Sequence, residues 1–552
     1  MTTPLYGAAP TTLLSATPIP AQTPASRPAL APTIARATLV SAGLLGVTAD
    51  ALMHDGPTGL GLALWIALLA LNAVVLFNRA GRTPSRQTLA WLTSAIVFSL
   101  GLMWRNSGAL QGFDFLAMLF SLAMAAISVR DPDAALFARR LRHTVFTAFD
   151  VGISTMVGVL PLAFRDAVLN ETSKSAVGRV RALARPALIA VAALVIFGSL
   201  LRNADPIFAS LIDLSAFDFE NIGSHVIVTG FFAWIVAGWA RGSLAENATM
   251  HRSLAPLPIR LGAADITAAL GTLAVLFAAF IATQIGWMFG GEKFLQARTG
   301  LTAAAYARQG FFQMVWVVTL VVPILVGTRA ALGPGRELAR RHTLLSLPVV
   351  VLLGAIIGSA MLRMKMYVHY YGLTTERLYP TVFMLWLATV ILWLAITVLR
   401  DWARPFIGGA VISGLTFLLA LNVADPDAIV ARVNVARAER IDSSAQTTLD
   451  LTHLASLNGN GTTLAIDALL RANVSNSVAT TPNTPAAQRC LAAKLILSRW
   501  SPQTSARRRT AAAGGWRYWN HDDARTFAAV DAHRSDLQRI ANEGCVAQPS
   551  DH

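Results

Sequence analysis

Long runs of apolar residues without a lysine or arginine constrain this chain more than any other feature of its sequence. Eleven such runs lie between residues 37 and 423. They are Ala37–Met53, Gly59–Phe77, Thr88–Met103, Ala109–Val129, Ala187–Leu201, Ile222–Ala240, Gly262–Ile285, Phe311–Gly327, Leu344–Leu362, Thr381–Leu399 and Phe406–Val423. A helix needs about 17 to 25 apolar residues to cross a bilayer, so the shorter runs must borrow flanking residues. The runs predict an all-α, polytopic transmembrane bundle with about eleven spans.

The composition excludes a single soluble globule of this length. Apolar residues make up 54% of the 552 residues and charged residues only 14%, with a mean hydropathy of +0.53. Soluble domains carry about 25% charged residues. A net charge of +15 would suggest nucleic acid as the partner of a soluble protein. In a membrane protein the position of the cations matters more, so the lipid bilayer is the expected partner and nucleic acid is not.

The cations are distributed unequally between the two sets of connections. Connections on the same side as the N-terminus hold 23 lysines and arginines, whereas those on the other side hold 8. Lysine and arginine accumulate in cytoplasmic loops of membrane proteins. The N-terminus is therefore expected in the cytoplasm, and the segment after the eleventh run is expected outside.

Three regions differ in composition. Residues 1–36 are rich in proline, threonine and alanine and predict a disordered cytoplasmic tail rather than a signal peptide. Residues 37–423 form the predicted transmembrane bundle, with its first span uncleaved. Residues 424–552 alternate helical stretches with polar links and predict a small α-helical extracytoplasmic domain.

The segment 143–164 is apolar enough to span the membrane, yet both of its flanks are basic. His143, Thr147, Asp150 and Ser154 share one face of a helix. We therefore expect an amphipathic helix lying in the plane of the cytoplasmic interface. The alternative is a twelfth span with Asp150 in the bilayer, which would reverse every later segment.

The only two cysteines, Cys490 and Cys545, both fall in the predicted extracytoplasmic domain. Two cysteines are too few for a four-cysteine metal or iron–sulfur site. In an oxidising compartment an even pair predicts a disulfide, and closing this loop would contribute about 4 kcal/mol. Two unpaired thiols are the alternative.

Acidic residues interrupt several apolar stretches. Asp50 and Asp114 are expected near the outer ends of their helices, at the level of Arg105 and Arg202, which could pair with them. They indicate a polar pocket or ion site in the outer leaflet, or simply helix-end residues that reach the headgroups. Asp265 is expected to be a first-turn carboxylate.

Two predicted outer connections, Glu292–Gly310 and Arg363–Pro380, are unusually polar and aromatic. Their tyrosines and arginines suit an anionic or glycan-like ligand, or else form an aromatic belt at the interface. Near the C-terminus, Asn520 and the acids after it predict a helix N-cap rather than a metal site. The sequence has no Walker loop, HExxH or GxSxG motif, so no catalytic residue, cofactor or metal is predicted.

Several stretches, in order, resemble a family of bacterial multi-pass membrane proteins catalogued as domain of unknown function 4153/4173. They are LLRNADPIFA (Leu200–Ala209), TGLTAAAYARQGFFQMV (Thr299–Val315), YVHYYGLTTERLYP (Tyr367–Pro380), DPDAIVARVNVARA (Asp425–Ala438) and WRYWNHDDAR (Trp516–Arg525). The resemblance covers roughly residues 40–540 and implies an integral inner-membrane protein. It carries over no catalytic residues. The chain departs from the family in its N-terminus and in Asp425, where asparagine is more usual.

The topology places the polar residues of these motifs on one face, where they are expected to form a ligand-binding patch beneath the C-terminal domain. The candidate residues are Arg202, Asp205, Tyr306, Arg308, Tyr370, Tyr371, Thr374, Arg377, Asp425, Asp427, Arg432 and Asn434. The first hypothesis is a non-enzymatic envelope sensor or assembly protein, bound to an envelope protein or a small anionic ligand. A secondary-transporter-like permease would show a water-filled midplane cavity. An enzyme acting on a lipid-linked substrate would show a lipid-lined groove.

Overall fold

The computed structural model describes most of the bundle and of the C-terminal helices. The described residues are 30–54, 59–130, 149, 151–167, 219–245, 260–299, 311–333, 335–397, 406–440, 449–471, 485–500 and 515–542. Within these ranges the secondary structure is helical, with no β-strand and a single isolated bridge between Leu261 and Leu332. The predicted all-α class is confirmed.

Ten helices of the described chain are long and apolar enough to cross a membrane. They are α1 (Pro32–Met53), α2 (Leu60–Arg79), α3 (Arg86–Trp104), α4 (Gly108–Arg130), α9 (Phe219–Ala245), α10 (Ala263–Thr299), α12 (Phe311–Ala330), α13 (Arg336–Tyr371), α14 (Thr375–Thr397) and α15 (Phe406–Ala424). They correspond to ten of the eleven predicted runs, and the run 187–201 lies outside the described residues. Outward-facing side chains such as Val275 (72% exposed) and Leu44 (64%) are apolar, as contact with lipid requires.

The helices extend beyond several predicted boundaries. Helix α1 begins at Pro32 rather than Ala37, because proline is favourable in the first turn of a helix. Helix α13 continues to Tyr371, and α14 begins at Thr375. The predicted connection Arg363–Pro380 is therefore mostly helical, with a short turn in its middle.

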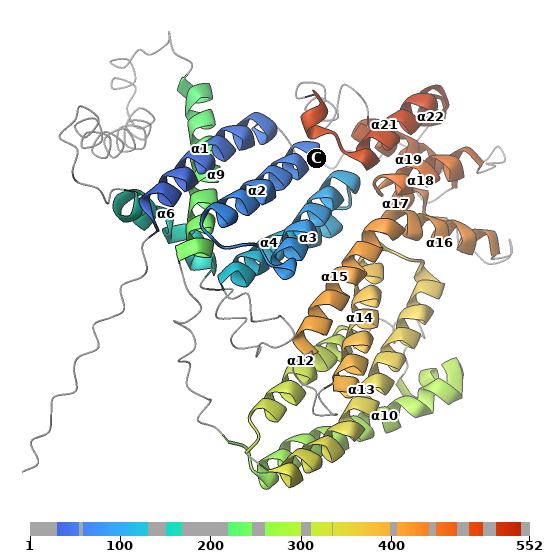
Figure 1. Cartoon of the computed structure of the whole chain (residues 1–552). Coiled ribbons are helices and arrows are strands. Elements are labelled where there is room, and N and C mark those ends of the chain that lie inside the picture. Colours follow the sequence, from blue (N-terminus) through green and yellow to red (C-terminus); the bar gives the residue numbers. More distant parts are fainter. Residues whose placement is uncertain are drawn as a thin grey trace, which may run out of the picture.

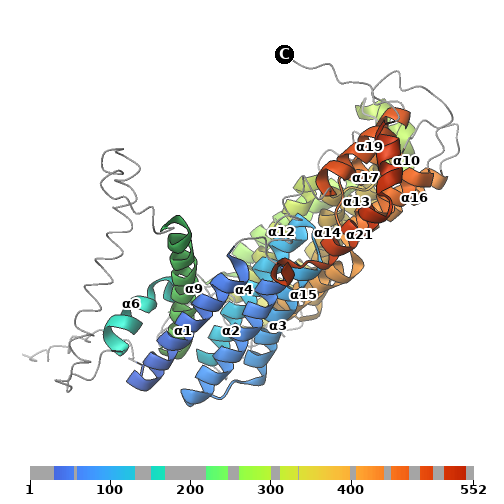
Figure 2. The same cartoon turned by 90° about the horizontal axis from the view of Figure 1, so that it is seen from above.

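The membrane helices form two bundles (Figures 1 and 2). The first bundle contains α1–α4 and α9, and its core is continuous. Helices α1 and α9 approach closely at Gly46, where a Cβ atom would lie 2.4 Å from the carbonyl oxygen of Thr229. The second bundle contains α10, α12, α13 and α14.

Helix α15 joins the two bundles. Its first residue, Phe406, belongs to the core of the second bundle, whereas Val411, Leu415 and Leu418 pack against the first. The contact between α15 and α14 of the second bundle requires a glycine at position 409, because a Cβ atom there would overlap the ring of Trp393.

A segment at 151–167 packs where α4 and α9 end, and it contains α6 (Val159–Pro161) and the π-helical turn η2 (Leu162–Asp166). The side chains of Arg241 on α9 and Asp166 form a buried ion pair with an N–O distance of 2.6 Å. Arg130 at the end of α4 donates to the hydroxyl of Ser154 at 2.9 Å. The predicted in-plane helix at 143–164 is only partly described, so its orientation in the membrane stays a prediction.

The C-terminal helices build a third core (orange and red in Figure 1). They are α16 (Pro426–Arg440), α17 (Leu451–Ala455), α18 (Asn460–Arg471), α19 (Pro485–Trp500), the 3-10 turn η4 (Gly515–Tyr518), α21 (His521–Ala532) and α22 (Arg534–Asn542). Leu373 and Leu378 from the α13–α14 turn also belong to this core. The C-terminal helices are thus packed directly onto one end of the bundle. Cys490 is buried and disulfide-bonded, and Cys545 lies outside the described residues.

Candidate functional site at the C-terminal face

One end of the bundle, here called the C-terminal face, carries the C-terminal helices. The end of α1, the α3–α4 and α13–α14 turns and the end of α15 all contact those helices there, for example through Arg517 and the carbonyl of Ala51. Helices α4 and α9 both end on the opposite face, where Arg130 donates to the carbonyl of Gly242 at 2.9 Å. The first span thus ends on one face and the fourth on the other, as expected if successive spans alternate in direction.

Arg105, in the α3–α4 turn, is the centre of a buried polar network. Its side chain is 7% exposed. Its guanidinium donates to the carboxylates of Asp425 at 2.7 Å and Asp522 at 3.2 Å, and to the carbonyl of Asn422 at 2.7 Å. The planar fork of donors on arginine suits several acceptors at once. One residue of the bundle therefore holds both the α15–α16 junction and the start of α21.

Asp425 has a backbone conformation that explains its residue type. Its φ is 62°, in the left-handed region, where it joins α15 to α16. Among residues other than glycine, asparagine and aspartate adopt this region most readily. Aspartate therefore suits this turn, and its carboxylate adds the ion pair with Arg105.

The start of α21 docks into the α3–α4 turn. Asn520 caps α21, as the sequence predicted, because its side chain accepts from the backbone N–H of Asp523 at 3.1 Å. Its amide also donates to the carbonyls of Leu102 and Arg105 at 3.2 and 3.3 Å. Sequence analysis recognised the cap but missed these contacts with the bundle.

Two carboxylates near Arg105, those of Asp427 and Asp522, have raised pKa values. Burial, together with the charges of Asp425 and Asp522, raises the pKa of Asp427 to about 7, although the hydrogen bond from the backbone N–H of Asn458 opposes this shift. Burial also raises the pKa of Asp522 to about 6, although Arg105 opposes this shift. The C-terminal helices are therefore attached by a network whose charge depends on pH.

The α13–α14 turn forms a second cluster, which is held by α16. Asn434 accepts from the backbone N–H of Leu373 at 2.8 Å and donates to its carbonyl at 2.7 Å. Arg377 lies over the ring of Tyr367 at 4.2 Å and donates to the carbonyls of Tyr371 and Gly372. These donors close the turn on itself.

Most of the predicted ligand-binding residues that the structure describes lie in two clusters. Arg202, Asp205, Tyr306 and Arg308 lie outside the described residues. Tyr370, Tyr371, Thr374, Arg377 and Asn434 gather at the α13–α14 turn, where the carbonyl of Thr374 accepts from the first turn of α14. Asp425 and Asp427 belong to the Arg105 network, and Arg432 is exposed on α16.

Arg105 pairs with neither intramembrane acid. Asp114 is fully buried and accepts from the amide of Asn422 on α15 at 2.8 Å. Asp50 lies at the end of α1 and binds two histidines instead. The reason is geometric, because Arg105 points away from the bundle to the carboxylates of the C-terminal helices.

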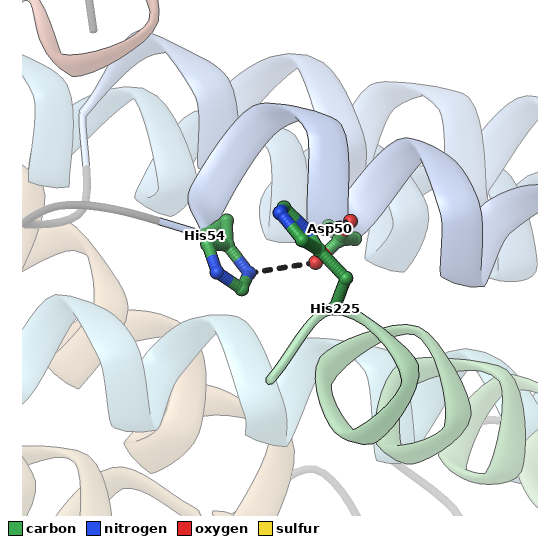
Figure 3. A group of neighbouring side chains, drawn as sticks. All are labelled: Asp50, His54 and His225. Atoms are coloured by element: carbon green, nitrogen blue, oxygen red, sulfur yellow. Dashed lines mark hydrogen bonds and ion pairs between the residues drawn. The ribbon is translucent and has the colours of Figure 1, made fainter. Parts of the chain in front are cut away.

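The histidines that bind Asp50 are His54, which caps the C-terminal end of α1, and His225 on α9 (Figure 3). Each Nδ1 atom lies against one carboxylate oxygen, at 2.8 Å for His54 and 2.7 Å for His225. Sequence analysis missed both. The spacing of Asp50 and His54 places them on one helical face, but nothing in the sequence indicates that His225 joins them.

An apolar cavity of about 310 Å³ lies in the second bundle. It is lined by Leu276, Phe277, Phe280, Gln313, Met314, Val317, Ile356 and Arg363. Arg363, 5% exposed, donates to the side-chain oxygen of Gln284 at 2.5 Å. The cavity thus has mostly apolar walls, and its two polar lining side chains are Gln313 at the start of α12 and Arg363 on α13.

These features define a multi-pass α-helical membrane protein with a helical cap on one face of its bundle. Within that class, the sequence model described as "Domain of unknown function (DUF4153)" matches residues 92–468, and the chain belongs to this family. No curated protein and no solved structure matches it. The matched region includes Arg105, Asp425 and the apolar cavity.

Proposed function

We propose that the protein is a non-enzymatic sensor or assembly protein of the bacterial cytoplasmic membrane. Its N-terminus lies in the cytoplasm and its C-terminal helices lie outside. The buried network around Arg105 is the observation that carries this proposal, because it joins the membrane bundle to the C-terminal helices through a few charged groups. A conformational change in the membrane bundle would therefore be transmitted to the C-terminal helices, and the reverse.

The surroundings of the network support its place at the membrane surface. Trp104, Trp516 and Trp519 are exposed near the contact between η4, α21 and the bundle. Tryptophan is enriched where a protein crosses from lipid to water. An outer-face partner would meet these rings and the exposed tyrosines of the α13–α14 turn.

The orientation is tested by fusing alkaline phosphatase, which is active only outside the cytoplasm, behind His552. We expect an active fusion there and an inactive fusion after Gly81, in the α2–α3 connection. Cys490 is then expected to pair with Cys545 and to react with a maleimide only after reduction. An inactive fusion at His552, with a fluorescent cytosolic reporter at the same position, would contradict the orientation.

The apolar cavity favours a second candidate function, which is binding of an anionic lipid or lipid-linked molecule. Its walls suit a hydrocarbon chain, and the guanidinium of Arg363 suits a phosphate at the polar end. Gln313, Gln284 and Ser359 supply further polar groups near that arginine. This candidate corresponds to the lipid-lined groove expected of a protein that acts on lipid-linked substrates.

Replacing Arg363 by methionine is expected to weaken binding of phosphatidylglycerol by about tenfold or more, because a charged hydrogen bond contributes about 1.5–3 kcal/mol. Native mass spectrometry in detergent measures the bound lipid, with phosphatidylcholine as the comparison. V317W fills the cavity, whereas the control L320W lies one turn away on an exposed face of α12. Equal lipid binding by V317W and L320W would exclude the cavity as the site.

A further inference from the structure

Three side chains of types that commonly bind metal ions converge at the C-terminal face, where α1 ends and α9 begins (Figure 3). Asp50 and His54 are one helical turn apart on α1, and His225 reaches them from α9. The ligating atoms of the three residues all lie within 4.8 Å of one another. The side chain of His225 is 46% exposed, so the group opens to the surroundings.

The arrangement is more specific than a chance meeting of polar side chains. Both Nδ1 atoms face the same carboxylate, one at each oxygen. The hydroxyl of Ser224 lies 3.1 Å from Nε2 of His54 and thereby orients that ring. The two imidazoles stack with their centroids 3.8 Å apart, a contact that is unfavourable if both carry a positive charge. A cation bound at their nitrogens would take the place of the protons.

We propose that Asp50, His54 and His225 bind one divalent transition-metal ion of the zinc class. Two imidazoles and one carboxylate are a common ligand set for zinc and its neighbours, and they leave a position for water or another ligand. Ser224 is the outer hydrogen-bond partner that fixes a ligating histidine.

Two adjustments allow the three side chains to accept the ion. A tetrahedral zinc ion with bonds of about 2.0–2.1 Å keeps its ligand atoms about 3.3 Å apart. The oxygen–nitrogen distances of 2.7 and 2.8 Å must therefore open by less than about 1 Å. Because an imidazole binds a metal through a lone pair in its ring plane, the His225 ring must also rotate out of its stack on His54 to point at the same ion. The side chain of His225 is 46% exposed, which leaves room for this rotation.

The site lies beside a contact between the bundle and the C-terminal helices. Arg517 of η4 donates to the carbonyl of Ala51, next to Asp50, and the N–H of Leu60 donates to the carbonyl of Trp519 at 3.1 Å. An ion that joins α1 to α9 fixes the end of α1 on which this contact rests. The metal would then be the ligand of the sensor, and this last step rests on the proposed function.

The test is titration of the full-length, EDTA-treated protein with Co²⁺, which reports tetrahedral coordination through its visible absorption. The wild type is expected to bind one equivalent. D50N and H225A are expected to lose about 100-fold or more in affinity, beyond the loss typical of outer-shell changes. The control H533A removes a histidine from the C-terminal helices and should bind as the wild type does.

A second measurement separates loss of a ligand from loss of the fold. Zn²⁺ is expected to raise the unfolding temperature of the wild type and of H533A, but not of H225A, while all three unfold alike in EDTA. Absence of binding by the wild type, or binding by D50N and H225A with the affinity of the wild type, overturns the site. A cytosolic reporter signal at His552 instead overturns the proposed function and leaves the metal site standing.

Discussion

Replacing Arg105 by methionine is expected to loosen the attachment of the C-terminal helices to the bundle near the α15–α16 junction. The change leaves the buried carboxylates of Asp425 and Asp522 without their cation, and removing one partner of a buried ion pair costs about 3–5 kcal/mol. The hydrogen bond to the carbonyl of Asn422 is lost as well. Limited proteolysis of the detergent-solubilised protein should then cut near the α15–α16 junction at conditions that leave the wild type intact.

An exposed ion pair in the same set of helices provides the matched control. Arg539 and Asp536 are paired on α22 with side chains 63% and 44% exposed, and R539M should change stability by less than about 1 kcal/mol. The conservative variant R105K keeps the charge but not the planar fork, so it should fall between wild type and R105M. If R105M resists proteolysis as well as R539M does, the network does not attach the C-terminal helices.

Acidification is expected to stabilise the attachment of the C-terminal helices. The pKa values of Asp427 and Asp522 are raised to about 7 and about 6, above the value of about 4 in an unfolded chain. The folded state therefore binds protons more tightly, so stability is greatest below about pH 4 and falls as the pH rises through 6 and 7. For the buried Asp427, the difference is on the order of 2–4 kcal/mol. The unfolding temperature should be higher at pH 5.5 than at pH 8.

The variant D427N isolates the carboxylate responsible. Asparagine keeps an oxygen that can accept from the N–H of Asn458, but it carries no charge beside Asp425 and Asp522. D427N should therefore be more stable than the wild type at pH 8 and should show a flatter pH profile. D536N, on the exposed face of α22, is the control. A wild-type pH profile in D427N would show that another group causes the dependence.

The membrane helices could be predicted because each needs only its own apolar residues. A span is favourable in the bilayer whatever it packs against, so hydropathy located ten helices that the structure describes. The ends were less certain. Helix α13 runs past Leu362 because Arg363 is accommodated inside the bundle by Gln284, a contact that hydropathy does not report.

The candidate sites could not be predicted in the same way, because their residues meet only through packing of distant segments. Arg105 and Asp522 are separated by 417 residues, and Asp50 and His225 by 175. The cap at Asn520 was predictable, since a cap depends on residues three positions apart. The motifs of the α13–α14 turn suggested a ligand site, but the structure uses Asn434 and Arg377 to close the turn.

Helix α15 gives the architecture a mechanical property. Helix α15 packs on both bundles and continues through Asp425 into α16. It therefore couples the two halves of the membrane part mechanically. If one bundle tilts relative to the other, α15 must rotate or lose part of its packing against one of them. Helix α16 follows the C-terminal end of α15 and carries both Asp427 and Asn434. A small rearrangement of the helices within the lipid bilayer would therefore displace the C-terminal helices relative to the membrane surface.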